Sequence, residues 1–420
     1  MVAKRSRRGS VTLIAEIRAD LEGLPTDVLL PPPRRGQSLR CVALTDAAPL
    51  GVHSAVVGAR LSDGREIWVP LVRDEAWRRA EPGDAMSLDA LMAPAPLVVH
   101  PGSARPDFSA YQERSLDVDM SNDIRIIDNS IVAKWQFVAE PGSLAGPRML
   151  EHLAEAGFEE APELLATVSW RGCLIVSYTK YLPDAEDGWG WMLKDVLGMI
   201  NGRVPAPEWP AHLGALTGRL HAAAARATSV IPQSLGHTDL APLARHYRAL
   251  LAAELDSNMR DALAQWTDRF ERACTVLESA SNVEVIPLHG DLHPGQFLRW
   301  RNGLAVSDFD GNPLVPAEER GHRGPTAHDV AGLLRGLDHV AIAASRRAED
   351  PDALMLGRSW ARQAREQALS AYLKVDGVPT LDESILSALE SLSPLHEAVY
   401  ASTYLPQWRY VPLAVLGGVW

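Results

Sequence analysis

The chain has 420 residues, of which 46% are hydrophobic and 22% charged, a composition typical of a globular protein with enough apolar residues for a packed core. Its formal net charge of −12 argues against non-specific nucleic-acid binding, which needs a cationic surface, so we expect no nucleic-acid partner. The three cysteines, Cys41, Cys173 and Cys274, are too widely spaced for a disulfide framework or a zinc cluster and favour a cytoplasmic protein.

The basic residues among the first ten positions predict a disordered tail rather than a signal peptide. The apolar stretch that follows, 11–17, is too short for the hydrophobic part of a signal sequence, and charged residues interrupt it. No stretch approaches the roughly 20 apolar residues of a membrane-spanning helix, so we expect no membrane partner. We also expect a monomer.

Residues 1–110 are predicted to form a first, β-rich domain that includes the basic tail. Strands are expected at 41–44, 54–61 and 66–71. Asp63-Gly64, between the last two, is typical of a hairpin turn. No residue of this segment suggests chemistry.

The second segment, 111–182, contains a lysine inside a predicted strand. The expected elements are a hairpin with strands at 124–127 and 130–135, a helix at 145–156 and a strand from 174 to 181. Burial of the Lys134 ammonium group costs free energy unless the group meets a partner or a phosphate. The alternative is a lysine on an edge strand whose head reaches solvent.

From residue 183 the apolar spacing becomes helical, so the segment 183–420 is predicted to be a mostly helical domain. Helices are expected at 209–225, as long amphipathic helices over 240–277, and at 325–348. Thr326 suits the N-cap of the last of these helices, and Asp329 suits its first turn. His221, inside the helix 209–225, is expected to be a packed residue rather than a catalyst.

The stretch 283–313 carries the strongest signal. An apolar run at 283–288 predicts a strand, and the polar loop 289–296 follows it. Asn302-Gly303 between two further apolar runs predicts a second hairpin. Because this hairpin folds the chain back, the loop before it should lie beside the residues after it.

The folded-back ribbon should bring Asp291 and Gln296 close to Asp308, with Asp310 nearby. Oxygen donors grouped in this way suit Mg²⁺. Such a site supports phosphoryl transfer, in which one Asp that is not a tight metal ligand receives the proton of the attacking hydroxyl. We assign Asp291 as this base and Gln296 and Asp308 as metal ligands.

A zinc-type metallohydrolase site is a second interpretation of the same loop, with His289, Asp291 and His293 as ligands. Against it, the other histidines are scattered and form no cluster at ligand spacing. Gln296 and Asp308 are oxygen donors, which suit Mg²⁺ better than zinc. In the phosphoryl-transfer interpretation, His289 has a structural role and shapes the loop.

The sequence His-Gly-Asp-x-His-x-Gly-Gln at 289–296, followed by Asp-Phe-Asp-Gly-x-Pro at 308–313, resembles the actinobacterial maltokinases and glucosamine kinases. These families belong to the aminoglycoside-phosphotransferase branch of the eukaryotic-kinase-like fold. The resemblance, good from about residue 120 onward, implies an α+β, bilobal protein-kinase-like fold. It implies a β-rich cap domain at 1–110, a nucleotide-binding N-lobe at 111–182 and a helical C-lobe at 183–420, with ATP and Mg²⁺ as cofactors.

The resemblance also implies which residues hold the nucleotide. They are Ser121, Asn122, Lys134, Glu151 and the backbone at Thr179 and Tyr181. Two positions depart from the family. Asp123 replaces a small hydroxyl residue, so either it points away from the phosphates or the loop binds nucleotide differently. Arg148 stands where a Glu usually pairs with the strand lysine, and Glu151 is the nearest substitute. Asp329 is implied to brace the catalytic loop.

The acceptor is implied to be a small-molecule sugar or amino sugar. Its candidate binding residues are Asp291, His293, Asp310, Asn312, Tyr404 and Trp408. Maltokinases commonly read Asp-Phe-Glu-Gly-Glu-Pro where this chain has Asp-Phe-Asp-Gly-Asn-Pro, and an acidic rim would suit an ammonium group. The resulting hypothesis is phosphorylation of D-glucosamine at its 6-hydroxyl. The alternatives are a maltokinase that forms maltose 1-phosphate, an aminoglycoside kinase, and a catalytically silent nucleotide-binding protein.

Overall fold

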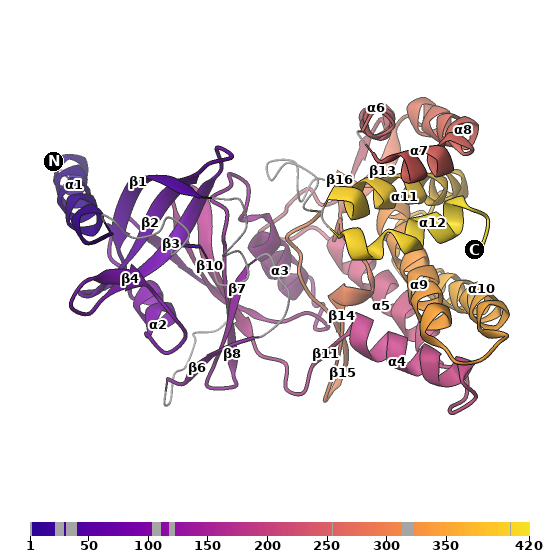
Figure 1. Cartoon of the computed structure of the whole chain (residues 1–420), viewed down its shortest axis with the longest axis horizontal. Coiled ribbons are helices and arrows are strands. Elements are labelled where there is room, and N and C mark those ends of the chain that lie inside the picture. Colours follow the sequence, from indigo (N-terminus) through magenta and orange to yellow (C-terminus); the bar gives the residue numbers. More distant parts are fainter. Residues whose placement is uncertain are drawn as a thin grey trace. The chain divides into compact units, whose positions relative to one another are not determined.

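The computed structural model describes residues 2–21, 29–30, 40–102, 111–116, 122–253, 255–312, 323–403 and 405–420, with side chains from Thr12 onward. The chain divides into two compact units (Figure 1). The first consists mainly of Met1–Glu151 and Pro162–Pro183, and the second of Asp184–Val315, Gly321–Trp420 and His152–Ala161. The domain boundary predicted near residue 110 lies outside the described residues. The boundary predicted after residue 182 lies next to that between the units.

A four-stranded antiparallel sheet in the order β1-β2-β3-β4 occupies the N-terminal part of the first unit. Its strands are β1 (Cys41–Pro49), β2 (Ser54–Leu61), β3 (Glu66–Arg73) and β4 (Trp77–Arg79). The three strands predicted here are therefore confirmed. The turn Asp63-Gly64 joins β2 to β3, and Gly64 has a φ of 88°, which glycine adopts without steric cost.

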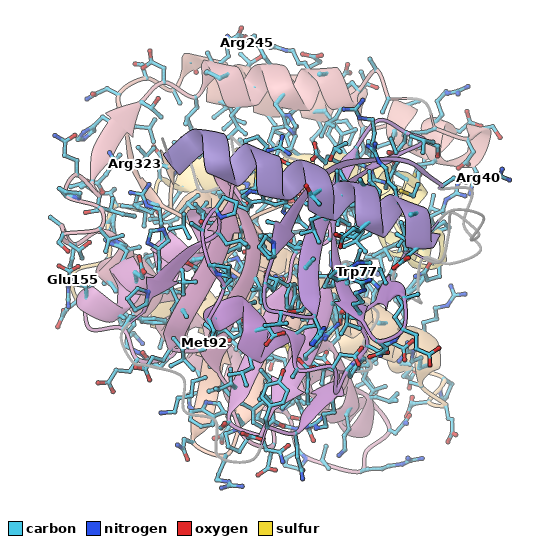
Figure 2. The ribbon with its side chains drawn as sticks, turned by 90° about the vertical axis from the view of Figure 1, so that its left-hand side faces the viewer. Arg40, Trp77, Met92, Glu155, Arg245 and Arg323 are labelled. Atoms are coloured by element: carbon cyan, nitrogen blue, oxygen red, sulfur yellow. The ribbon has the colours of Figure 1, made fainter. Side chains whose placement is uncertain are left out.

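The prediction of a disordered N-terminal tail is wrong, because α1 (Val2–Leu21) is a helix. The apolar side chains Leu13, Ile14, Ile17 and Leu21 recur at helical spacing and pack against the core of the four-stranded sheet. Figure 2 shows α1 lying across this sheet. The charged residues that interrupt the apolar run in sequence leave this stripe intact, so burial against the sheet stabilises the helix.

Replacement of Ile17 by alanine should lower the free energy of unfolding by about 2–4 kcal/mol, because the Ile17 side chain of α1 is fully buried in the core of the four-stranded sheet. Chemical denaturation measures this difference. The matched control is Glu16→Ala in the same turn, which removes a half-exposed ion pair with Arg73 and should cost less than about 1 kcal/mol. Equal effects of the two changes would mean that α1 does not dock on the sheet.

A second, six-stranded sheet in the order β5-β9-β10-β8-β7-β6 completes the first unit. Its strands are β5 (Val98–Pro101), β6 (Glu113–Ser115), β7 (Asp123–Ile127), β8 (Ile131–Trp135), β9 (Leu164–Trp170) and β10 (Cys173–Lys180). The predicted β7–β8 hairpin is confirmed. Its turn residues Asp128 and Asn129 both have positive φ, as a two-residue hairpin turn of this kind requires.

One of the hydrophobic clusters in the first unit contains side chains from both of its sheets. Trp68 from β3 packs with Trp135 and Tyr178 from the six-stranded sheet, and all three side chains are buried. The helix α2 (Met86–Leu91) adds Met86 to this core. The helix α3 (Ala145–Glu155) lies within one residue of the predicted range.

The second unit is mostly helical, as predicted. Its helices are α4 (Gly188–Ile200), α5 (Trp209–Ala224), α6 (Ala241–Leu250), α7 (Ser257–Ala264), α8 (Thr267–Ser279), α9 (Ala327–Arg347), α10 (Ala353–Tyr372), α11 (Glu383–Thr403) and α12 (Tyr410–Leu416). One small sheet joins β11 (Glu186–Asp187), β14 (Phe297–Trp300) and β15 (Gly303–Val306); another joins β12 (Gly236–Thr238), β13 (Val283–Pro287) and β16 (Arg323–Gly324). Among the described residues, no helix combines the length and the apolar character that crossing a membrane requires.

The helix α9 is the central support of the second unit, because most of its residues are buried and it packs against α4, α10 and α11. Its observed range agrees with the predicted helix at 325–348. Thr326 is the N-cap residue, as predicted, but its side chain makes no capping hydrogen bond. The Thr326 hydroxyl instead donates to the carbonyl of Thr380, so it ties the start of α9 to the segment before α11.

Candidate active site

The predicted hairpin that follows the polar loop is present. Strands β14 and β15 pair antiparallel from Phe297↔Val306 to Trp300↔Gly303, and β13 precedes the loop as expected. Gly303 has a φ of 128°, so the turn uses the conformational freedom of the Asn-Gly pair. The chain therefore folds back on itself where the sequence indicated.

Ser307, the residue after β15, fastens both ends of the loop. Its carbonyl accepts a hydrogen bond from His289 Nε2 at 2.9 Å, and its N–H donates to the carbonyl of Gln296 at 2.9 Å. The other ring nitrogen of His289, Nδ1, accepts from the N–H of Asp291 at 3.3 Å. The loop that carries Asp291 and the turn that carries Asp308 are therefore held by one small backbone frame.

These contacts contradict the metallohydrolase interpretation. Both ring nitrogens of His289 are occupied, because Nε2 donates to Ser307 and Nδ1 accepts from Asp291. A zinc ligand needs a free nitrogen lone pair. Moreover, the described part of the chain contains no group of three or more His, Cys, Asp or Glu side chains placed to hold a metal ion. His289 shapes the loop, as expected.

Asp329, in the first turn of α9, braces the loop as expected. Its carboxylate accepts the backbone N–H groups of His289 and Gly290, each at 2.9 Å, and lies 3.2 Å from His221 Nε2. The other ring nitrogen of His221 contacts the Tyr372 hydroxyl at 2.9 Å. His221 is thus a packed helix residue whose ring is fixed from both sides and supports Asp329.

The charge of Asp329 is stabilised in place. Burial alone would raise its pKa, but the hydrogen bond from His221 and the neighbouring imidazoles outweigh burial and hold the pKa well below its ordinary value. The side chain is fully buried. A buried carboxylate that accepts several hydrogen bonds is a stiff anchor, so the start of the loop has little freedom to move.

Asp329→Asn should destabilise the protein by about 1–3 kcal/mol, because an amide has one oxygen and cannot accept all these donors. It should also lower kcat, since the loop would shift. Because the folded pKa of Asp329 is depressed, its stabilising contribution is present above the unfolded pKa of about 4 and is lost as the pH falls. Denaturation of both proteins at pH 7 and at about pH 3 tests this: the stability difference should shrink at the lower pH, and a constant difference would contradict the role.

Two glycines allow the loop to lie directly on its supporting helices. A Cβ atom at Gly188, the first residue of α4, would stand 1.9 Å from the carbonyl oxygen of Pro294. One at Gly332 of α9 would stand 2.5 Å from the carbonyl oxygen of Leu292. Both distances are far below contact, so only glycine permits this approach.

The proposed metal donors have the chemistry of a hard-cation site. Asp308 adopts a φ of 61° directly after Ser307, and the Gln296 side chain is 8% exposed. Gln296 contacts His293 Nε2 through its side-chain amide at 3.1 Å. One carboxylate and one amide are fewer protein donors than a metal cage requires, but Mg²⁺ commonly takes one or two protein ligands and completes its shell with phosphate oxygens and water. The donor set therefore fits Mg²⁺, and the ligand roles stay a prediction.

His293 lies beside the predicted base. Its Nε2 is 3.9 Å from a carboxylate oxygen of Asp291, and its Nδ1 accepts the N–H of Gly295 at 3.1 Å. Burial lowers the pKa of His293, and the negative charges of Asp291 and Asp308 offset this only in part. The direction of this shift favours the neutral form of the ring beside Asp291.

Asn312, a predicted acceptor-binding residue, contacts His396 of α11, with 3.3 Å between the Asn312 side-chain amide nitrogen and His396 Nε2. Burial lowers the pKa of His396, and the charge of Asp291 opposes this shift. Asp310 lies two residues before Asn312, and its role stays a prediction. His396 was not singled out from the sequence.

Trp408 is connected to the catalytic loop through a residue that sequence reasoning missed. Trp408 lies in a short 3₁₀ turn, Pro406–Trp408, and its ring centroid is 4.8 Å from that of Trp189. The Trp189 ring is in turn 6.4 Å from the rings of His293 and His339. The sequence signal was the Asp187-Gly188-Trp189 start of α4, where the Asp187 side chain caps the helix by accepting from Gly190 N–H.

The predicted nucleotide residues lie in the first unit. Lys134 stands in β8, opposite Ser177 of β10 and Ile124 of β7. Because β8 is an inner strand, the edge-strand alternative for Lys134 is wrong. Asn122 accepts the N–H of Phe137 through its side-chain oxygen at 3.1 Å.

The remaining predicted site residues keep the status of predictions. Thr179 pairs with Val132 inside β10, and Glu151 is half-buried in α3. The N–H of Tyr181 donates to the carbonyl of Ser130 at 2.8 Å, so an adenine contact at Tyr181 would use its carbonyl. Ser121 and Tyr404 lie outside the described residues.

No model of a known protein family matches the sequence. Individual proteins do. A glucosamine kinase of Streptacidiphilus jiangxiensis is 34% identical over 400 residues, which cover 89% of this chain and 90% of that protein. A glucosamine kinase of Mycolicibacterium smegmatis is 33% identical over 371 residues, covering 83% of this chain and 92% of that protein.

Solved structures agree with the sequence comparison. A glucosamine kinase in complex with glucosamine, ADP and inorganic phosphate is 30% identical, with a TM-score of 0.74 over 96% of this chain and 98% of that chain. A second crystal form of a glucosamine kinase is 31% identical, with a TM-score of 0.76 over 96% and 98% of the two chains. The predicted kinase-like fold is thereby confirmed, and the chain belongs to the glucosamine kinase family.

Proposed function

We propose that this protein transfers the γ-phosphate of ATP to the 6-hydroxyl of D-glucosamine and that the reaction requires Mg²⁺. The observation that carries the proposal is the loop with Asp291, which Ser307 and Asp329 fix from two sides, on a chain of the glucosamine kinase family. A related solved structure holds glucosamine, ADP and inorganic phosphate. An enzyme of this kind must hold a base rigidly at the acceptor hydroxyl.

In the proposed reaction, the acceptor oxygen forms a bond to the γ-phosphorus, the bond to the ADP oxygen breaks, and the hydroxyl proton passes to Asp291. Bound Mg²⁺ would neutralise charge on the phosphates. Gln296 and Asp308 are the residues that would hold it. Lys134, with the segment that ends at Asn122, would bind the phosphates.

The acceptor site is proposed to include His293, Asp310, Asn312 and Trp408. The carboxylate of Asp310 would favour an ammonium group at the sugar, because a charge-assisted hydrogen bond is about twice as strong as a neutral one. Trp408 offers an apolar ring face of the kind that sugars stack on. This set distinguishes glucosamine from neutral hexoses by charge rather than by size.

A panel of acceptors tests the proposal through release of ADP. Glucosamine should give the highest kcat/KM, glucose and N-acetylglucosamine should react weakly because both lack the ammonium group, and kanamycin and maltose should be poor substrates. Glucose is the matched control, since it replaces the ammonium group of glucosamine by a hydroxyl of similar size. Preference for maltose would overturn the choice of acceptor, and no ADP release with any acceptor would overturn the activity.

A further inference from the structure

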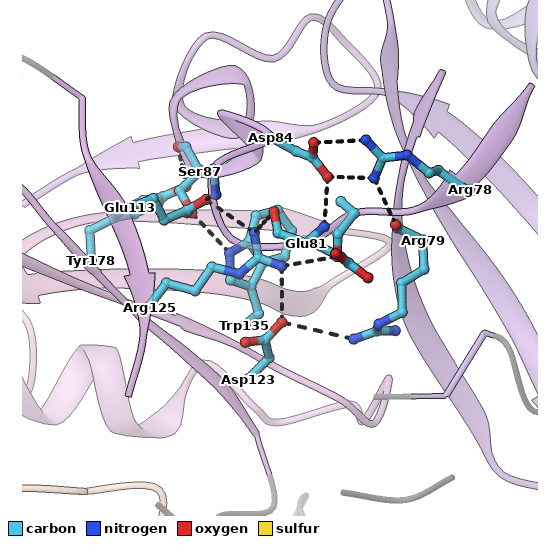
Figure 3. Close-up of polar contacts among 12 residues, drawn as sticks. Arg78, Arg79, Glu81, Asp84, Ser87, Glu113, Asp123, Arg125, Trp135 and Tyr178 are labelled. Atoms are coloured by element: carbon cyan, nitrogen blue, oxygen red, sulfur yellow. Dashed lines mark hydrogen bonds and ion pairs between the residues drawn. The ribbon is translucent and has the colours of Figure 1, made fainter. Parts of the chain in front are cut away.

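The first unit contains a buried ion cluster that the proposed chemistry does not use. The side chains of Arg125 and Glu113 are fully buried, and Asp123 is 22% exposed. Arg125 Nη1 is 3.3 Å from Glu113 Oε2, and Nη2 donates to Asp123 Oδ2 at 3.0 Å (Figure 3). The guanidinium also lies over the ring of Trp135, 5.8 Å from its centroid. One buried cation thus lies between two carboxylates on neighbouring strands.

The cluster joins these strands to the segment between β4 and α2. Arg125 also reaches the carbonyls of Ala80 and Glu81, each at 3.4 Å. Glu113 accepts the hydroxyl of Ser87 at 2.6 Å and the N–H of Gly83 at 3.0 Å. The N-terminal part of the chain therefore supplies the walls of a polar core around Arg125.

Asp123 is one of the two positions in the predicted nucleotide site at which the sequence departs from the family pattern. It directly follows Asn122, the predicted phosphate-binding residue, so a free carboxylate here would repel phosphate. Its carboxylate, however, is directed into the cluster, 3.0 Å from Arg125 and 3.8 Å from Arg79. Arg125 is therefore the nearer of two guanidinium groups beside Asp123, and Figure 3 shows the Asp123 carboxylate facing both.

The cluster also fixes both ends of the connection between β6 and β7. Glu113 is the first residue of β6 and Asp123 the first of β7, and these strands pair antiparallel from Glu113↔Ile127 to Ser115↔Arg125. Arg125 bonds to both carboxylates, so it joins the strand that leads into the connection to the strand that leads out of it. A buried ion pair of this kind is costly to break, because removal of one partner leaves an uncompensated charge.

We infer that Arg125 is a positioning residue for the nucleotide, which keeps the Asp123 carboxylate turned into the cluster and away from the phosphates bound beside Asn122. The inference rests on the proposed nucleotide role of Asn122. According to this inference, the polar core of the first unit contributes to ATP binding as well as to folding. The same role of Arg125 also explains how an aspartate can follow Asn122, the predicted phosphate-binding residue, without repelling the phosphates.

Three variants separate the two tasks. Arg125→Met should lower the melting temperature and raise the Kd for ATP about tenfold, as expected for one uncompensated negative charge near the phosphates. The double variants Arg125→Met/Glu113→Gln and Arg125→Met/Asp123→Asn each remove one buried carboxylate and should both regain melting temperature. Only the variant that carries Asp123→Asn should regain ATP affinity, to within about twofold of the natural protein.

Isothermal titration calorimetry with ATP and Mg²⁺ measures the affinities without an acceptor, so failure of the proposed sugar specificity would not affect the result. Arg78→Met is the matched control. It breaks the pair of Arg78 with Asp84 in the same segment without touching β6 or β7, and should leave ATP affinity unchanged. Equal ATP affinities of the two double variants would overturn the inference, as would an unchanged affinity in folded Arg125→Met.

If Arg125→Met gives no folded protein, Arg125→Lys provides the test. Lysine keeps the positive charge but loses the bidentate fork. ATP affinity should then stay within about threefold of the natural protein even though the melting temperature falls, because the charge of Asp123 remains balanced. If Arg125→Lys lost as much ATP affinity as the double variant Arg125→Met/Glu113→Gln, this would contradict a charge-based role of Arg125.

Discussion

Asp291→Asn is expected to lower kcat for glucosamine phosphorylation by about 10²–10⁴-fold, the range that loss of a positioned base produces. The amide keeps the size of the side chain but has no basic oxygen for the hydroxyl proton. The backbone N–H of Asp291, which His289 accepts, is unchanged, so the loop should keep its shape. The KM for ATP should stay within about threefold, because the proposed phosphate contacts belong to Lys134 and the metal ligands.

Steady-state kinetics with varied ATP and varied glucosamine measures both quantities. The matched control is Asp195→Asn. It removes the 3.0 Å ion pair between Asp195 and Arg299 in the second unit and should leave kcat unchanged. Retention of the natural rate by Asp291→Asn would show that another group takes the proton. A parallel loss of ATP affinity would instead assign Asp291 to the metal site.

Asp308→Asn is expected to produce the second-largest effect, a rise of at least about tenfold in the Mg²⁺ concentration that gives half-maximal rate. Loss of the charge weakens a hard-cation ligand, whereas the backbone is preserved, because asparagine tolerates the left-handed conformation that Asp308 adopts at φ 61°. Titration of the rate with Mg²⁺ at saturating ATP measures the shift.

Asp184→Asn provides the comparison for Asp308→Asn. Asp184 also has a positive φ, of 60°, and pairs with Arg301 at 2.9 Å on the surface of the second unit. It has no proposed role at the metal, so its replacement should not change the Mg²⁺ dependence. If both variants respond to Mg²⁺ like the natural protein, Asp308 is not a ligand and the donor set must be revised.

The catalytic ribbon could be predicted from sequence because its signals are local. The Asn302-Gly303 turn determines the hairpin, and the hairpin determines that the loop 289–296 meets the residues after β15. The bracing role of Asp329 came from the family resemblance, and its contacts with the loop agree with it. Lys134 could be placed in a strand, but that the strand is internal depends on pairing with β10, far along the chain.

Other features depend on packing between distant segments, which periodicity does not reveal. The apolar stripe of α1 is too narrow to predict a helix without the sheet on which it docks. Trp189 and Trp408 are more than 200 residues apart in sequence, and the contact between their rings required the fold. The direction in which the Asp123 side chain points depends on Arg79 and Arg125. The sequence shows that both residues are charged, but it does not show that they lie beside Asp123 in the fold.

A structure of the protein crystallised with ADP, Mn²⁺ in place of Mg²⁺, and glucosamine tests the central claim most directly, because anomalous scattering locates the metal. The account predicts a metal peak about 2.0–2.3 Å from oxygens of Gln296 and Asp308. It also predicts the 6-hydroxyl of glucosamine within about 2.6–3.2 Å of the Asp291 carboxylate. A metal bound elsewhere, or a sugar hydroxyl that faces a different side chain, would contradict it.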